Sequence, residues 1–353
     1  MLDVRFPYSG PGLIKIIGVG GAGGNAVGRM YERGTDNIFY AICNTDFQDL
    51  NRSDVPCKIT LGENLCNGRG CGANSKKGKA AAEESIDEIS SLFGDGSIVF
   101  IIAGMGGGTG TGAAPVIAKT AKEKGHLTIG VVTMPFSWEQ ENRINKAKDG
   151  LRNMLATTDA IMVFNNQQIS RTYEDRPVSE GFKEADDIIA SATLGIADIV
   201  ENPDKINLDQ ADITAVLKNS GVAIMNTGEA DGENRVIQAL TNAVEHPLLK
   251  GRDIGKSSYI LIHISSPKED EITLGELNGV NEFVEKFSKK GNISLKEIFW
   301  GLSVRDEKGS KCRVTLIATG FTLDDVCDWH LYEREKNKPS TDHAPIIDLD
   351  DWA

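Results

Sequence analysis

The sequence predicts an α/β fold, in which a doubly wound, mostly parallel sheet is followed by a long central helix and a smaller α+β C-terminal domain. Three observations predict it. Short apolar runs alternate with segments of helical apolar spacing over residues 13–166, as in repeated βαβ units. Residues 182–202 keep helical spacing for about 20 positions, and Asn202-Pro203 ends that helix. Strand-like runs then return at 257–266, 292–306 and 312–320, and we expect them to form a second sheet.

The elements of the first region follow from apolar runs, glycines and helical spacing. Residues 13–34 predict a strand, a glycine turn and a helix, and residues 97–125 repeat that pattern. Both turns follow the carboxyl end of a strand, where doubly wound sheets bind their ligands. The other predicted elements are strands at 38–46, 57–62, 126–136 and 159–166, helices at 80–94 and 142–158, a glycine-rich loop at 63–78, and two helices that flank 221–228.

Composition restricts the class of protein. A chain of 353 residues is long enough for about two domains. The formal net charge of −13 argues against a nucleic-acid partner. The six cysteines form no metal-type CxxC pair, and we interpret them as reduced cytoplasmic thiols. The sequence shows no signal peptide and no apolar run of the ~18 residues needed to span a bilayer, so we expect a cytoplasmic protein with only indirect membrane contact.

The turn at residues 104–112 reads GMGGGTGTG and holds six glycines. Glycine costs conformational entropy, which a chain accepts where its backbone turns tightly or approaches a ligand closely. A helix N-terminus offers unpaired N–H groups to a phosphate. The turn is not a P-loop, because Ala113-Ala114 stand where that motif needs Lys-Ser/Thr. A tight turn without a ligand is the alternative, but the interleaved Thr109 and Thr111 favour a phosphate cradle.

A second glycine turn lies at residues 18–23, GVGGAG, which match GxGxxG between a strand and a helix. Asp46 follows at about the right distance for a ribose contact. Alone, the pattern indicates either a dinucleotide site or close packing of a helix on a strand. The additional turn at 104–112 favours a site that holds a long phosphate tail from both sides. Residues 70–74, GCGAN, either add N–H groups to that site or form an ordinary surface loop.

Several charged residues have both a structural and a functional interpretation. Glu139 and Arg143 are four apart near a helix start, as in a solvated ion pair. Asp186 and Asp187 on the long helix are typical of a solvated face, although a carboxylate can also accept from the donor groups of a base. Phe182 lies four residues before Asp186 and could stack on such a base.

Asp209 and Asp212 stand three apart at a predicted helix start, so they project from one face. Aspartate is a preferred residue at such positions, because it accepts hydrogen bonds from unpaired backbone N–H groups. The functional interpretation is that the two carboxylates polarise a water molecule. Their spacing does not choose between these two roles.

Together, these motifs resemble the FtsZ family, the bacterial cell-division branch of the tubulin superfamily. The resemblance covers roughly residues 12–321, and GGGTGTG is specific to the superfamily. It implies a GTP-binding domain (1–176), a central helix (177–203), a GTPase-activating C-terminal domain (204–321) and an acidic, flexible tail (322–353). The matching segments are GVGGAGGNAV, CNTD, GCGANSKKG, GGGTGTGAAP, MPFSWEQENR, FKEADD, NLDQAD, NTGEADGENR and RVTLIATGF.

The resemblance also implies roles for individual residues in binding GTP or GDP. It implies that Mg²⁺ is carried by the nucleotide and not by protein ligands, and that the catalytic Asp209 and Asp212 reach into the next subunit to orient the attacking water. The binding residues that it implies are Gly20, Gly21, Gly107, Gly108, Thr109 and Gly110 for the phosphates, Gly72, Ala73 and Asn74 for the γ-phosphate, Glu139 and Arg143 for ribose with Asn25 and Asn166 nearby, and Phe182 and Asp186 for guanine.

The resemblance therefore implies a GTPase that forms head-to-tail homopolymers at a mid-cell ring on the inner face of the membrane. The alternatives are a superfamily paralogue with a cell-shape or scaffold role and, from the first glycine turn alone, an NAD-binding oxidoreductase. The tail departs from the family, whose basic, apolar tip binds membrane anchors. Here the tip reads HAPIIDLDDWA, and we expect it to dock a different division or scaffold partner. A disordered end, or one that folds back on its own domain, is the alternative.

Overall fold

The computed structural model describes residues 14–34, 37–94, 98–168, 177–201, 208–245, 254–281, 283, 297–305, 309–327, 329 and 332. The strands are β1 (Ile14–Val19), β2 (Ile38–Asn44), β3 (Cys57–Thr60), β4 (Ile98–Gly104), β5 (Leu127–Met134), β6 (Ala160–Asn165), β7 (Gly221–Ala230), β8 (Tyr259–Pro267), β9 (Glu297–Arg305) and β10 (Cys312–Phe321). The helices are α1 (Gly20–Glu32), α2 (Phe47–Arg52), α3 (Glu63–Cys66), α4 (Ser75–Glu84), α5 (Ile86–Ser91), α6 (Thr109–Glu123), α7 (Glu141–Thr157), α9 (Val178–Glu201), α10 (Gln210–Leu217), α11 (Arg235–Glu245) and α13 (Leu323–Val326), with short 3-10 turns η1 (Ser137–Glu139) and η2 (Ile254–Lys256).

The first six strands form a parallel sheet in the order β3-β2-β1-β4-β5-β6. This is the doubly wound order, in which the direction of winding reverses between β1 and β4. The carboxyl ends of β1 and β4 are therefore neighbours, and each is followed by a glycine-rich turn. The predicted sheet and both turns are confirmed by this topology.

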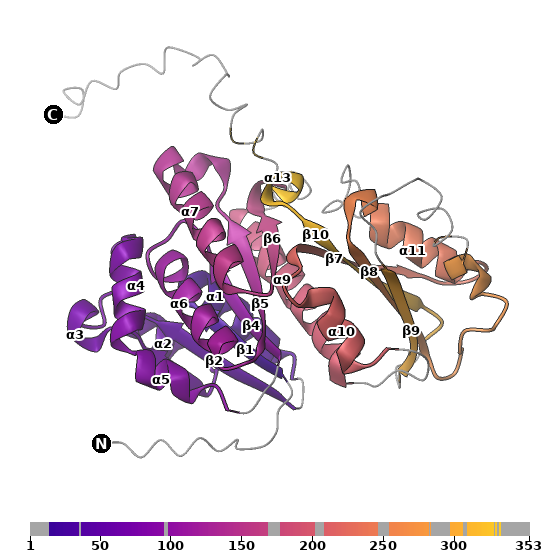
Figure 1. Cartoon of the computed structure of the whole chain (residues 1–353), viewed down its shortest axis with the longest axis horizontal. Coiled ribbons are helices and arrows are strands. Elements are labelled where there is room, and N and C mark those ends of the chain that lie inside the picture. Colours follow the sequence, from indigo (N-terminus) through magenta and orange to yellow (C-terminus); the bar gives the residue numbers. More distant parts are fainter. Residues whose placement is uncertain are drawn as a thin grey trace, which may run out of the picture.

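Helices cover both faces of this parallel sheet (Figure 1). One buried cluster joins one face of the sheet to α1, α2, α9 and α10, and a second joins the other face to α4, α5, α6 and α7. Strands such as β1 and β4 are buried on both faces, which explains why they read as unbroken apolar runs. The core therefore fixes the height and direction of every strand end that carries a turn.

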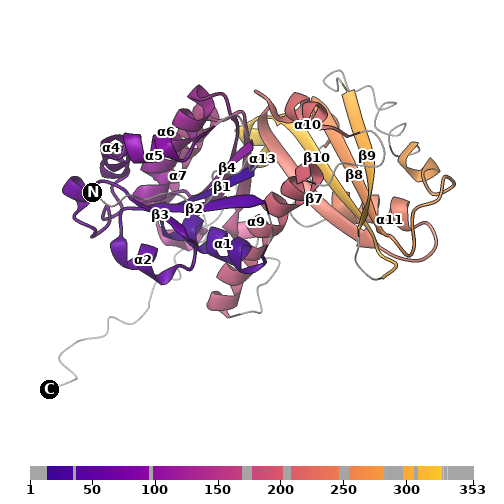
Figure 2. The ribbon, with the colours of Figure 1, turned by 90° about the horizontal axis from the view of Figure 1, so that it is seen from below.

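The second region is built from β7, β10, β8 and β9, with α11 packed on β7 and β10. We expected it to form a separate sheet, but the described strands form one continuous sheet. The connection is a short parallel pairing of β6 with β7, from Ala160↔Gly221 to Met162↔Ala223. Figures 1 and 2 place α9 between the two regions, and its 24 residues would span about 36 Å.

The helix predicted at 80–94 is two helices, α4 and α5, that meet at Ser85. The buried Ser85 hydroxyl accepts from Gly62 N (3.0 Å) and donates to Thr60 O (3.4 Å). A serine that bonds to backbone outside its own helix competes with regular helical pairing, which accounts for the break. The same bonds fix the end of β3 against this helix pair.

The chain after β10 is described only as far as α13 and a few positions beyond it. Thr322 and Asp325 cap α13 reciprocally, and Lys256 binds the same carboxylate at 2.9 Å. These hydrogen bonds lower the pKa of Asp325 to about 2. The tip at 342–353, which we expected to dock a partner, lies outside the described residues.

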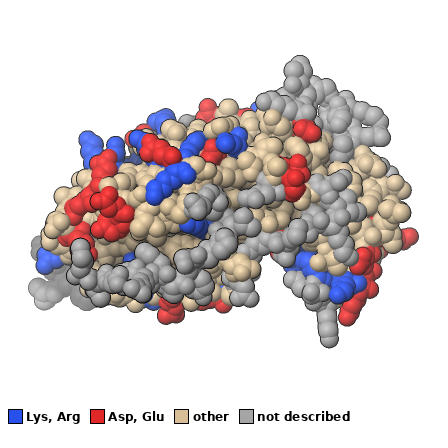
Figure 3. Space-filling model, turned by 60° about the horizontal axis from the view of Figure 1, so that its bottom comes forward, with Lys and Arg blue, Asp and Glu red and all other residues tan. Residues whose placement is uncertain are grey.

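Two surface properties bear on partners. On the face shown in Figure 3, acidic and basic side chains lie beside one another and do not form a continuous basic stripe. Such a stripe is what a polyanion would need, and the net charge is −13. Within the described residues, none of the helices is long and apolar enough to cross a membrane.

Candidate nucleotide-binding site

Three glycine turns meet where the winding of the sheet reverses. Gly20 has a φ of +73°, and a Cβ there would lie 3.0 Å from Gly110 N. A Cβ on Gly108 would lie 3.0 Å from Asn74 N and 2.7 Å from the Cβ of Cys71. The turns after β1 and β4 and the turn at 71–74 are therefore in direct contact. Any side chain at Gly20 or Gly108 would separate them.

Two further glycines of these turns, Gly72 and Gly107, have open space where a side chain would lie. A Cβ on Gly107 or on Gly72 would meet no atom within 4 Å beyond the chain neighbours. Gly72 has a φ of +55°, a left-handed conformation that itself favours glycine, whereas Gly107 has no such conformational reason. The open space beside Gly107 is what a phosphate cradle needs, because a bound anion would approach the bare backbone there.

Hydroxyl and amine groups hold the turns in place. Thr45 and Thr109 share a hydrogen bond of 2.7 Å between their hydroxyls, which ties the end of β2 to the start of α6. Thr111, one of the two interleaved threonines, is buried and accepts from Gly106 N at 2.8 Å, so it braces the turn from within. Lys146 on α7 donates to Ala73 O at 3.0 Å. These three hydrogen bonds tie the turns to β2, α6 and α7.

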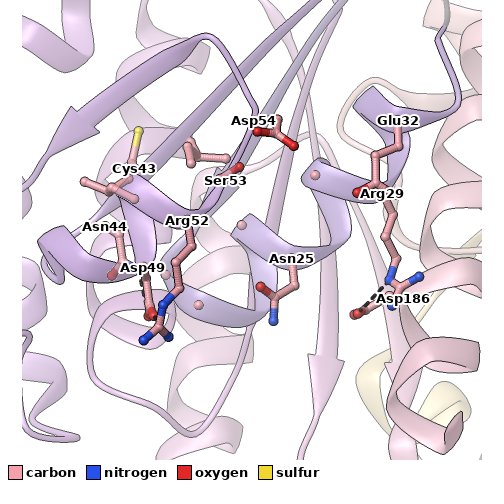
Figure 4. A pocket seen from close by; sticks show the side chains of 16 residues that line it. Asn25, Arg29, Glu32, Cys43, Asn44, Asp49, Arg52, Ser53, Asp54 and Asp186 are labelled. Atoms are coloured by element: carbon pink, nitrogen blue, oxygen red, sulfur yellow. Dashed lines mark hydrogen bonds and ion pairs between the residues drawn. The ribbon is translucent and has the colours of Figure 1, made fainter. Parts of the chain in front are cut away.

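A cavity of about 440 Å³ opens beside Gly20 and Gly21 (Figure 4). Its walls come from α1, the end of β2, α2 and α9. Figure 4 shows Asn25 directed into this space, with Asp186 and Arg29 on one side and Asp49 and Arg52 on the other. The lining residues are Gly20, Gly21, Gly24, Asn25, Gly28, Arg29, Glu32, Ile42, Cys43, Asn44, Asp49, Leu50, Arg52, Ser53, Asp54 and Asp186.

Asp186 is half-buried between α9 and α1, unlike a carboxylate on a solvated face. It accepts from Arg29 Nε at 3.3 Å. Burial raises the pKa of Asp186 to about 6, and Arg29 opposes that rise. Asp187, one residue on, turns to the rim and pairs with Arg33 at 2.8 Å. The structure therefore separates two carboxylates that the sequence could not distinguish.

Glu139 and Arg143 lie at the end of β5, as the pattern predicts. They bind each other at 3.1 Å, and Glu139 also accepts from Phe136 N at 2.9 Å. The ion pair expected from the spacing of Glu139 and Arg143 is therefore present. A bound ligand would have to compete with these existing contacts. Asn166 follows β6 at the same edge, and its buried Oδ1 has no hydrogen-bond partner among the described residues.

Asp209 and Asp212 cap the start of α10. Asp209 N donates to Asp212 Oδ2 at 3.1 Å, and Asp212 N donates to Asp209 Oδ1 at 2.9 Å. The two aspartates therefore form a capping box, which is the structural role expected for them from the sequence. Neither residue lines the cavity beside Gly20, and no residue of the turns at 104–112 and 71–74 lines it either. Phe182 lies on α9, but its side chain is outside the described part of the structure.

Asp46 does not have the role that a dinucleotide fold would give it. Its carboxylate accepts from Gln48 N (2.9 Å) and Asp49 N (3.4 Å) and so caps α2. Both bonds fall on Oδ1, so the capping role accounts for this aspartate without a ribose contact. The oxidoreductase interpretation therefore gains no specific support from Asp46.

Sequence reasoning missed three residues of the site. Arg29 pairs with Asp186, Lys146 holds the turn at 71–74, and Asp49 lies near Gly21, 3.5 Å from the position of a Cβ there. Each stands on a helix where charged residues are usually solvated. The helical spacing of Arg143 and Lys146 on one face of α7 was the one available signal.

An order-reversing parallel sheet with glycine turns at the reversal defines a nucleotide-binding domain. Comparison with known protein families identifies the family of this domain. The model of the tubulin/FtsZ family GTPase domain matches residues 13–174, and that of the FtsZ family C-terminal domain matches residues 221–322. The cell division protein FtsZ of Porphyromonas gingivalis (strain ATCC BAA-308 / W83) is 40% identical over 327 residues, which cover 92% of this chain and 70% of that protein. The chain therefore belongs to the FtsZ family of tubulin-like GTPases.

Solved structures agree with this assignment. An empty FtsZ dimer from M. jannaschii matches with a TM-score of 0.77 and 36% identity, over 87% of this chain and 88% of that one. The GTPgS-bound protofilament of CetZ2 from Haloferax volcanii matches with a TM-score of 0.75 over 92% of this chain and 97% of that one. At 20% identity, the second likeness supports the fold alone.

Proposed function

We propose that this chain is a GTPase of bacterial cell division that polymerises head to tail and hydrolyses GTP between subunits. The observation that carries the proposal is the contact of three glycine turns around an open space beside Gly107. Backbone N–H groups at the start of α6 would bind the phosphates, so no lysine is needed. Membership of the FtsZ family supports GTP as the nucleotide.

The individual binding roles are part of this proposal. Gly20, Gly21, Gly107, Gly108, Thr109 and Gly110 hold the phosphates, and Gly72, Ala73 and Asn74 contact the γ-phosphate. Asp186 and Phe182 hold guanine, while Asn25, Asn166, Glu139 and Arg143 surround the ribose. Mg²⁺ enters on the phosphates and not through protein ligands. When bound, the ion would neutralise phosphate charge.

The catalytic part of the proposal places Asp209 and Asp212 in the site of the adjacent subunit. The exposed position of Asp209 at the start of α10 supports this arrangement. The matching FtsZ dimer supports self-association. The domain limits at 176, 203 and 321, a cytoplasmic mid-cell ring, and a tail that docks division or scaffold proteins belong to the same proposal.

The proposal is tested by sedimenting the protein with GTP, GDP or NAD while phosphate release is measured. Pelleting that depends on GTP, with a specific activity that rises from near zero as protein concentration increases, is the expected result. A rate per subunit that stays constant on dilution would show a complete site within one chain, and binding of NAD alone would show an oxidoreductase.

Replacing Asp186 by asparagine should change which base is bound. A carboxylate accepts from both N1–H and the 2-amino group of guanine, whereas asparagine presents one acceptor and one donor. Asp186→Asn should therefore weaken GTP binding by about tenfold or more, since a bidentate pair discriminates by ~1–3 kcal/mol, and improve relative binding of xanthosine triphosphate. Asp187→Asn is the matched control. Competition binding that gives the same GTP-to-XTP ratio in both variants would remove Asp186 from the base site.

Binding of GTP should also depend on pH through the same carboxylate. Burial raises the pKa of Asp186 to about 6, so the charged form is present above that pH and is lost below it. Between pH 7 and pH 5 the affinity should fall by about tenfold through this group. Titration of the nucleotide itself is removed by subtracting the Asp186→Asn profile, and two parallel profiles would contradict the prediction.

A further inference from the structure

Two of the six cysteines lie against each other beneath the turn at 71–74. The sulfurs of Cys66 and Cys71 are 3.9 Å apart, and both side chains are buried. Cys66 ends α3, and Cys71 opens the turn, so only four residues separate them. Both thiols are reduced in this structure.

Cys71 is also in contact with the proposed phosphate site. Its sulfur donates to Thr45 Oγ1 at 3.3 Å and lies 3.7 Å from Thr109 Oγ1. Its carbonyl accepts from Asn74 N at 3.1 Å, which closes the turn. A Cβ on Gly108 would lie 2.7 Å from the Cβ of Cys71. A displacement of Cys71 is therefore transmitted directly to Thr109 and Gly108.

We propose that Cys66 and Cys71 are a modification site, where a hydroperoxide forms a reversible disulfide that disables the GTP site. The inhibitory part of this inference rests on the proposed function. The Cys71 thiol reacts with hydrogen peroxide to give a sulfenic acid and one water. The Cys66 thiol then attacks that sulfur, and the hydroxyl leaves as a second water. Two thiols and one peroxide thus give one disulfide and two waters, and the peroxide is reduced.

Forming the bond requires a movement at the phosphate turns. A disulfide bond is about 2.0 Å long, so the sulfurs must approach by about 1.9 Å from 3.9 Å. Any part of that movement made by Cys71 shifts its sulfur relative to Thr45 Oγ1 and Thr109 Oγ1. The turn that carries Gly72, Ala73 and Asn74 is anchored by Cys71, so it shifts relative to Gly108. The γ-phosphate contacts lose their alignment.

The surroundings of Cys66 favour its protonated form. Burial, with a smaller contribution from Cys71, raises the pKa of Cys66 to about 11, so Cys66 is an almost wholly protonated thiol near neutral pH. A thiol of that kind reacts slowly with peroxide, which needs a thiolate. The overall rate should therefore increase with pH.

The test treats the full-length protein with hydrogen peroxide and maps its disulfides by mass spectrometry of a non-reduced digest. We expect a Cys66–Cys71 peptide, a fall in GTPase activity and GTP binding of at least about tenfold, and recovery of both with dithiothreitol. Cys66→Ala removes the partner sulfur and leaves the Cys71 contacts to Thr45 and Thr109 in place. It should keep basal activity and lose sensitivity to peroxide, and Cys66→Ser serves as a second variant if alanine reduces stability.

Two results would overturn the inference. One is inhibition by peroxide that persists in both Cys66 variants, and the other is a mapped disulfide that leaves GTP binding unchanged. Failure of the proposed function is distinct, because it would appear as a reduced wild-type protein that neither binds nor hydrolyses GTP, whatever disulfides the peptide map contains.

Discussion

Gly107→Ala is expected to abolish GTP binding while the protein stays folded. The new methyl group would meet no protein atom within 4 Å, so the fold has room for it. It would project into the space that the phosphates are proposed to fill and would separate them from the N–H groups at the start of α6. We expect the GTP affinity to fall by at least about 100-fold, which corresponds to about 2.8 kcal/mol. Isothermal titration calorimetry measures this loss.

The matched control is Gly94→Ala. Gly94 is exposed in the loop before β4, and its nearest neighbour would be Lys15 Nζ at 3.9 Å from the new Cβ. Both variants should melt within a few degrees of the wild type, and only Gly107→Ala should fail to bind GTP. If Gly107→Ala binds GTP as tightly as Gly94→Ala, the turn is a packing feature and the phosphates lie elsewhere.

Asp212→Asn is expected to keep GTP binding and filament formation but to lose turnover. In the proposed mechanism, the Asp212 carboxylate of one subunit orients the water that attacks the γ-phosphate bound to its neighbour. A neutral amide cannot accept a proton from that water, and general acid–base groups contribute roughly 10²–10⁴ in rate. Phosphate release should therefore fall by at least about 100-fold.

The choice of asparagine separates catalysis from helix capping. Asp212 accepts from Asp209 N at 3.1 Å, and the amide oxygen of asparagine can accept the same hydrogen bond. Asp212→Asn should therefore leave the start of α10 intact, with a melting temperature near that of the wild type. A variant that hydrolyses GTP at the normal rate would leave capping as the role of Asp212.

The fold was predictable from sequence because its strands are locally distinct. Runs such as 97–103 are apolar on both faces, and glycines mark the turns that follow them. The link between the two regions was not predictable. It is a pairing of β6 with β7 over only three residue pairs, and α9 and α10 separate these two strands along the chain. Nothing local in either strand specifies that neighbour.

The part of the site that is formed by backbone groups of the glycine turns was predictable from the sequence. Glycine turns after strands have a clear pattern, and the structure brings them together as expected. Side-chain roles were less accessible, because the pairing of Arg29 with Asp186 joins residues 157 positions apart. Asp209 and Asp212 illustrate the same limit, since one pair of carboxylates at a helix start suits capping and catalysis equally well.

Each GTPase site is proposed to be shared between two subunits, and mixing two inactive variants tests this sharing. Gly107→Ala subunits should bind no GTP but carry an intact Asp212, while Asp212→Asn subunits should bind GTP but lack that carboxylate. If the site is shared, a Gly107→Ala subunit completes the site of an Asp212→Asn neighbour. Phosphate release, absent from either variant alone, should reappear in the equimolar mixture and increase with total protein concentration. A mixture that stays as inactive as its components, while still co-sedimenting with GTP, would contradict the shared site.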